Sequence, residues 1–74
     1  KHRLLHIHQN VPGVMSEINK VFADNGINIS GQFLQTNDKV GYVVIDITAT
    51  EQQAALVKEE LAAIPGTLRT RILY

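Results

Sequence analysis

The sequence predicts a single α+β domain in which a four-stranded antiparallel sheet carries two helices on one face. The chain has only 74 residues, which is enough for one domain. Its apolar spacing changes between strand-like and helix-like in the order β-α-β-β-α-β. That order has one common compact solution, the ferredoxin-like or split βαβ arrangement, and the right-handed crossover rule puts both helices on the same side.

The first three elements are a strand, a helix and a strand. Closely spaced leucine and isoleucine predict a strand over residues 3–8, before the turn at Pro12-Gly13. Apolar residues then recur at helical spacing, at Val14, Ile18 and Phe22. Asn25-Gly26 ends this helix, because glycine tolerates the left-handed conformation found at many helix ends. Residues 27–36 form the second strand, and residues 37–39 form a turn.

The third strand, over residues 41–49, is the clearest element because it is dense in β-branched residues. Two sets of side chains alternate along it: Val43, Ile45 and Ile47 on one face, and Tyr42, Val44 and Asp46 on the other. The first set suits the core beneath the helices. The second set is mixed in polarity, and we expect this open face, or the sheet edge beside it, to contact another copy or another domain.

A helix and a strand complete the chain. Thr50 and Gln53 have the spacing of a capping box at the start of the second helix. The core face of this helix is predicted to consist of Ala54, Val57, Leu61 and Ile64. Pro65-Gly66 ends the helix, and residues 67–74 form the last strand.

Composition excludes several classes of function. Seven basic and seven acidic residues balance, and Arg69 with Arg71 is too small a cluster for a nucleic-acid surface. The chain has no cysteine, no glycine-rich phosphate loop, and no serine, histidine and acid in a known nucleophile pattern, so we expect no catalysis. Because a core this small gives little stability, we expect oligomerisation or attachment to a larger protein. The start at Lys1 also suggests a domain cut from a longer chain.

Two histidines alternate on the first strand. His6 and His8 lie two residues apart, so they project from the same face. We expect His6 on the open face and His8 beside the loop that follows. If the first and third strands are neighbours, Asp46 could join them in a two-histidine, one-carboxylate metal set. Since no second ligand cluster supports this alternative, we predict no metal site.

The loop from His8 to Val14 runs from a strand end into a helix start. The first helical N–H groups have no partner inside the helix, and the helix dipole favours an anion there. A small carboxylate fits such a place, Gly13 allows close approach to the backbone, and His8 and Asn10 offer polar groups at the rim. The alternative is that Asn10 only caps the helix.

Asn28 is the second unusual polar position. It lies between two isoleucines at the start of a strand, where a buried amide needs a hydrogen-bond partner. It could bond its own backbone, or it could reach a polar ligand across an interface.

The motif His8-x-Asn10-x-Pro12-Gly13-Val14, followed by Gly26-Ile27-Asn28-Ile29, closely resembles the ACT domain family. Members of this family are ferredoxin-like modules that regulate amino-acid metabolism by binding amino acids. Further resemblance, to ACT domains at the C-terminus of NAD-dependent dehydrogenases of serine synthesis, covers residues 32–36, 41–46 and 64–74.

The resemblance implies a non-catalytic, cytoplasmic domain that binds L-serine for feedback control of a larger enzyme. It implies no cofactor in this domain, with NAD bound elsewhere in that enzyme. It also implies a homodimer formed by edge-to-edge sheet pairing, within a tetrameric enzyme, with serine at the junction. The residues carried over to the serine site are His8, Asn10, Val11, Gly13, Val14, Asn28 and Ile29.

Within this implied site, His8 and Asn10 contact serine from one subunit, and Asn28 of the partner subunit completes it. The backbone around Val11 and Gly13 lies near the serine carboxylate. Val11 departs from relatives that carry a charged residue, which leaves the affinity open.

Two other functions stay open from the sequence, and a third, RNA binding, is disfavoured. The domain could be a purely structural dimerisation module, or an ACT domain that senses another amino acid. An RNA-binding sheet of the same topology needs exposed aromatic residues on the two central strands, and only Tyr42 is available there.

Overall fold

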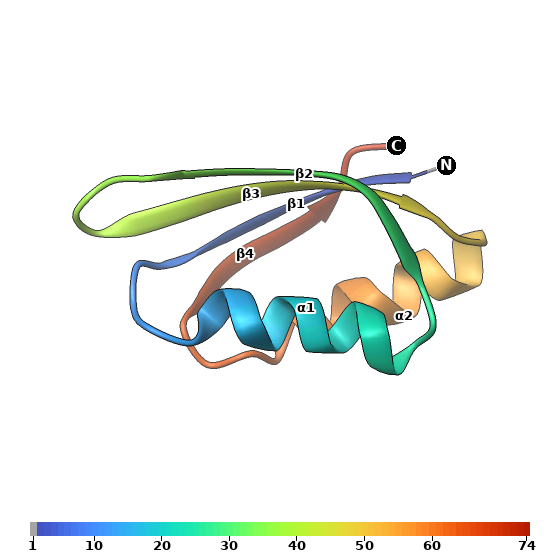
Figure 1. Cartoon of the computed structure of the whole chain (residues 1–74), viewed down its shortest axis with the longest axis horizontal. Coiled ribbons are helices and arrows are strands. Elements are labelled where there is room, and N and C mark those ends of the chain that lie inside the picture. The colour runs from blue at the N-terminus through green and yellow to red at the C-terminus, as the bar shows by residue number, and fades with distance from the viewer. Residues whose placement is uncertain (1) are drawn as a thin grey trace.

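The computed structural model describes residues 2–74 and has the predicted architecture (Figure 1). Its elements are β1 (His2–Gln9), α1 (Val14–Asp24), β2 (Asn28–Thr36), β3 (Val40–Thr48), α2 (Glu51–Ala62) and β4 (Thr67–Ile72). The strands form one antiparallel sheet in the order β2-β3-β1-β4, and both helices cover the same face. The predicted ferredoxin-like fold is therefore confirmed.

The core lies between the sheet and the two helices. Twelve buried apolar side chains form it: Leu4, Val14, Ile18, Phe22, Ile27, Val43, Ile45, Ile47, Ala54, Val57, Leu61 and Ile64. The residues predicted for the core from both helices and from β3 are all among them, although Ile64 lies beyond the end of α2 at Ala62. The alternation along β3 is thus confirmed, because a strand turns successive side chains to opposite faces.

Local signals place the helix ends. Thr50 Oγ1 accepts a hydrogen bond from the Gln53 backbone N–H at 3.1 Å, and Gln53 Oε1 accepts one from the Thr50 N–H at 2.9 Å. The predicted capping box is therefore present. After α1 and α2, Gly26 and Gly66 adopt φ values of 65° and 95°, in the left-handed region where glycine carries no steric penalty.

The last strand is shorter than predicted. It ends at Ile72, although backbone hydrogen bonds between Arg3 and the segment that follows continue to Tyr74. These bonds hold the two ends of the chain together at one end of the sheet (Figure 1). Neither helix within residues 2–74 has the length and apolarity that a membrane crossing requires.

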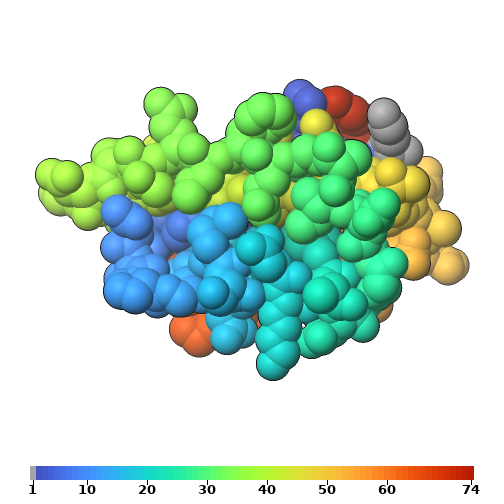
Figure 2. Space-filling model, in the orientation of Figure 1, coloured from blue at the N-terminus to red at the C-terminus, as the bar shows by residue number. Residues whose placement is uncertain are grey.

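The β2–β3 hairpin projects beyond the helices, as Figure 2 shows on one side of the molecule. Leu34 pairs with the buried Val43 and therefore points to the helix-covered face, yet half of its surface is exposed. Phe33, on the opposite face of β2, is 64% exposed. Since β2 is an edge strand, this edge presents apolar side chains on both faces of the sheet.

Candidate functional site

The loop between β1 and α1 has the backbone geometry of an anion site. Gly13 is the N-cap of α1 with φ 91°, and no side chain caps the helix. The first N–H groups of α1 therefore lack a side-chain partner, and they carry the positive end of the helix dipole. Beside them lies an open cavity of about 470 Å³, lined by Val11, Pro12, Gly13, Val14, Glu17 and Pro65.

Asn10 does not cap α1, so that alternative is wrong. Its Nδ2 donates to the Asn37 carbonyl at 2.9 Å, and its backbone N–H donates to the Lys39 carbonyl at 3.0 Å. Both partners belong to the turn between β2 and β3. The sequence distance of 27 residues explains why local spacing did not reveal this contact. The loop is fixed against the hairpin, and Asn10 Oδ1 remains available as an acceptor.

His6 and His8 do share a face, but it is the core face and not the open one. They continue the alternation of Leu4, so His6 is fully buried and His8 is 3% exposed. The prediction that His6 lies on the open face is therefore wrong. Polar side chains are uncommon in a protein core, so the sequence favoured the open face for His6. The two histidines can be buried because both are hydrogen-bonded.

The alternative of a metal site formed by His6, His8 and Asp46 is also wrong. Asp46 lies opposite Arg3 on the other face of the sheet, and Arg3 Nε donates to its Oδ1 at 2.6 Å. The sheet itself separates this carboxylate from the histidine rings. Within residues 2–74, no three histidine, aspartate or glutamate side chains are grouped as metal ligands.

A chain of hydrogen bonds links the buried histidines to α2 and β4. His6 Nδ1 lies 3.2 Å from His8 Nδ1, His6 Nε2 lies 2.9 Å from Thr67 Oγ1, and Thr67 Oγ1 donates to the Leu61 carbonyl at 2.9 Å. Burial lowers the pKa of His6 to about 4, with the neighbouring His8 contributing, and burial also lowers the pKa of His8. Both imidazoles are therefore neutral at pH 7.

Gly41 and Thr67 are site residues that the sequence reasoning missed. Gly41 is paired with His8 across β1 and β3, and the His8 ring lies over it. A β-carbon on Gly41 would come within 2.4 Å of His8 Nε2. Only glycine leaves room for the ring in this position. A glycine at the start of a strand dense in β-branched residues was visible in the sequence. That this glycine makes room for His8 could be known only from the register of β1 against β3.

Asn28 lies far from the loop in the same chain. It pairs with Thr48 at one end of β3, whereas His8 pairs with Gly41 at the other end, about 23 Å away at strand spacing. Asn28 is exposed, and its side chain bonds no other described residue. Ile29 is partly buried against the core. One copy of the chain thus holds the two halves of the predicted site at opposite ends of the sheet.

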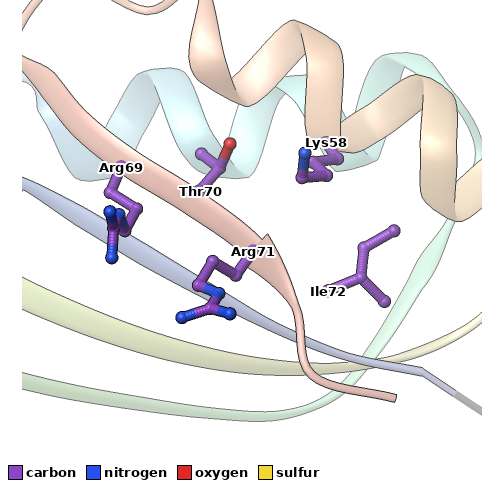
Figure 3. A pocket seen from close by; sticks show the side chains of 5 residues that line it. All are labelled: Lys58, Arg69, Thr70, Arg71 and Ile72. Atoms are coloured by element: carbon purple, nitrogen blue, oxygen red, sulfur yellow. The ribbon is translucent and has the colours of Figure 1, made fainter.

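A larger open cavity, of about 560 Å³, lies elsewhere, between α2 and β4 (Figure 3). Figure 3 shows that Arg69 and Arg71 extend from one face of β4 while Thr70 points to the other, toward the α2 side where Lys58 lies. The three basic groups do not converge on one point. Their arrangement does not make an anion site, and we place the candidate site at the β1–α1 loop instead.

Comparison with known proteins identifies close relatives. The sequence model of the AHAS small subunit-like ACT domain matches residues 4–69. The chain is 54% identical over 72 residues to D-3-phosphoglycerate dehydrogenase of Escherichia coli K12, and 46% identical to that of Haemophilus influenzae. These matches cover 97% of this chain but only 18% and 17% of the two relatives, so the chain spans less than a fifth of their length.

Solved structures share the fold at low sequence identity. The ACT domain from GTP pyrophosphokinase of Chlorobium tepidum has a TM-score of 0.85 at 14% identity, covering 97% of this chain and 95% of that one. The small subunit of acetolactate synthase from Thermotoga maritima has a TM-score of 0.83 at 19% identity, covering 96% of this chain and 45% of that one.

Proposed function

This chain belongs to the ACT domain family of the AHAS small subunit-like type, and on that premise we propose that it is an L-serine-binding regulatory domain. We assign it to the C-terminus of a D-3-phosphoglycerate dehydrogenase, on the basis of 54% identity over nearly its whole length. The NAD-dependent chemistry then belongs to other domains of that enzyme, and this domain catalyses no step. The observation that carries the proposal is that His8 and Asn28 lie at opposite ends of the sheet in one chain. In a twofold dimer, Asn28 of one subunit can lie near His8 of the other.

The proposed dimer joins two β2 edges. A twofold axis perpendicular to the sheet makes the two β2 strands antiparallel and keeps all four helices on one side, in an eight-stranded sheet. The start of β2 in one subunit then faces the end of β2 in the other. Asn28 is at the start, and the loop containing Asn10 is bound to the turn after the end. The exposed Leu34 and Phe33 favour burial of this edge.

The chemistry of the completed site suits a small zwitterion. The uncapped N–H groups of α1, near Gly13 and Val14, suit a carboxylate. His8 Nε2 and Asn10 Oδ1 are acceptors for an ammonium or a hydroxyl group, and the amide of Asn28 from the partner subunit offers both a donor and an acceptor. A ligand held by two subunits stabilises the dimer by mass action. Serine binding is thereby coupled to the relative position of the domains attached to the two subunits.

Isothermal titration of the chain with the twenty amino acids tests this proposal. We expect heat of binding with L-serine, and a shift toward the dimer in sedimentation when serine is added. Clear binding of a different amino acid, with none for serine, removes the serine assignment. A stable dimer that binds no amino acid instead supports a purely structural dimerisation module, which the apolar edge of β2 also suits.

Replacement of Asn28 by alanine is expected to weaken serine binding about tenfold. This change is at the low end of the cost of an unpaired polar group, since Asn28 is exposed before the dimer forms. The same titration measures it, with Gln52→Ala as the control because Gln52 is an exposed polar residue on α2. Equal affinity of Asn28→Ala and Gln52→Ala argues against an interface site at this position.

A further inference from the structure

The hydrogen-bond chain from Leu61 to His8 fixes the position of each proton along it. The Thr67 hydroxyl has a single proton and donates it to the Leu61 carbonyl. Thr67 Oγ1 can therefore only accept from His6, so His6 Nε2 carries a hydrogen. His6 is fully buried and neutral at pH 7, so its Nδ1 has a lone pair. The 3.2 Å contact between the two Nδ1 atoms then requires the proton to be on His8.

At its His8 end, the hydrogen-bond chain presents an acceptor nitrogen that solvent reaches. A neutral His8 with its proton on Nδ1 has an unprotonated Nε2, which can accept a hydrogen bond. Every fully buried side-chain nitrogen and oxygen within residues 2–74 has a hydrogen-bond partner, yet His8 Nε2 makes none. This nitrogen therefore belongs to the small part of His8 that solvent reaches. It lies over Gly41, and His8 is the second-last residue of β1 before the loop that leads into α1.

We infer that Thr67 and His6 are positioning residues that fix His8 as the Nδ1–H tautomer, so that its Nε2 accepts a hydrogen bond from the bound amino acid. The inference about the tautomer stands on the contacts alone, whereas its role in binding rests on the proposed function. The group of the ligand that meets His8 is then a donor, either the ammonium or the hydroxyl. The carboxylate, which has no proton to give, is excluded from this position and left to the N–H groups of α1.

The tautomers can be measured in the free chain by long-range proton–nitrogen NMR of the imidazole rings at pH 7. We expect His6 to carry its proton on Nε2 and His8 on Nδ1, in the wild type and in Thr67→Ser, which keeps the hydroxyl. Thr67→Val has nearly the same shape without the hydroxyl, and there we expect both rings to show mixed tautomers. A wild-type His8 with its proton on Nε2 overturns the inference.

Serine titrations of the same variants test the role in binding. We expect Thr67→Val to bind L-serine about three- to tenfold more weakly, and Thr67→Ser to match the wild type. Mixed tautomers in Thr67→Val together with unchanged affinity overturn the role in binding. If the tautomers are as inferred but the wild type binds no serine, the proposed function fails while the assignment of protons stands.

Two serine analogues identify the donor group. L-Alanine keeps the ammonium without the hydroxyl, and 3-hydroxypropanoate keeps the hydroxyl and has no donor in place of the ammonium. The analogue that retains the donor facing His8 is expected to show the three- to tenfold penalty in Thr67→Val, and the other analogue is expected to show none. Either pattern supports the inference. An absent penalty for both analogues contradicts it.

Discussion

Gly41→Ala is expected to displace the His8 ring, to lower the stability of the chain by about 1–3 kcal/mol, and to abolish measurable serine binding. The added β-carbon would lie 2.4 Å from His8 Nε2 and 2.8 Å from Cε1, which no small adjustment of a packed imidazole relieves. The ring must rotate, and rotation breaks the contact with His6. Urea unfolding measures the stability, and calorimetry measures the binding.

Gly31→Ala is the matched control. A β-carbon there meets its nearest neighbours at 3.5–3.8 Å, which is ordinary van der Waals contact, and its φ is not in the left-handed region. We expect its stability to stay within about 0.5 kcal/mol of the wild type. If Gly41→Ala unfolds at the same urea concentration as Gly31→Ala, the placement of the His8 ring over Gly41 is wrong.

Acid is expected to destabilise the domain by about 3 kcal/mol through His6 alone. The pKa of His6 is about 4 in the folded chain and about 6.5 when unfolded, because burial opposes the charged imidazole and His8 is the titratable group that faces it. Between these values the unfolded chain binds more protons, so stability rises with pH. The contribution is fully present above about pH 6.5 and is lost progressively as the pH falls to about 4.

A His6→Leu variant isolates this effect. Leucine fills a similar volume and cannot titrate, although it leaves His8 Nδ1 without its partner and lowers stability at every pH. Urea unfolding from pH 7 to pH 4 is expected to show a shallower decline for His6→Leu than for the wild type. Carboxylates titrate equally in both proteins and cancel in the difference. Parallel pH profiles contradict a neutral, buried His6.

The elements of the fold could be predicted because their signals are local. The alternation of Val43, Ile45 and Ile47 with neighbours of mixed polarity identifies a half-buried strand without knowledge of its partners. The capping box of Thr50 and the glycines after the helices likewise act over three or four residues. The order of these elements then leaves few compact topologies.

The candidate site could be predicted only in part. Its polar residues were named from the loop and from the resemblance to ACT domains, but their contacts were not. Asn10 was considered as a helix cap, whereas its amide bonds the carbonyl of Asn37 in another turn. His6 was placed on the open face, whereas it is buried and bonds Thr67, which is 61 residues away in the sequence.

By itself, the sequence determined which segments become helices and strands, which side chains share a face, and where the helices begin and end. These properties follow from backbone periodicity and from hydrogen bonds between near neighbours in the chain. Only the tertiary structure decided that the histidines face the core, that Thr67 reaches them, and that Asn28 and the β1–α1 loop lie at opposite ends of the sheet. The reason is that strand register and cross-strand contacts join residues whose separation along the chain carries no information about their distance in space.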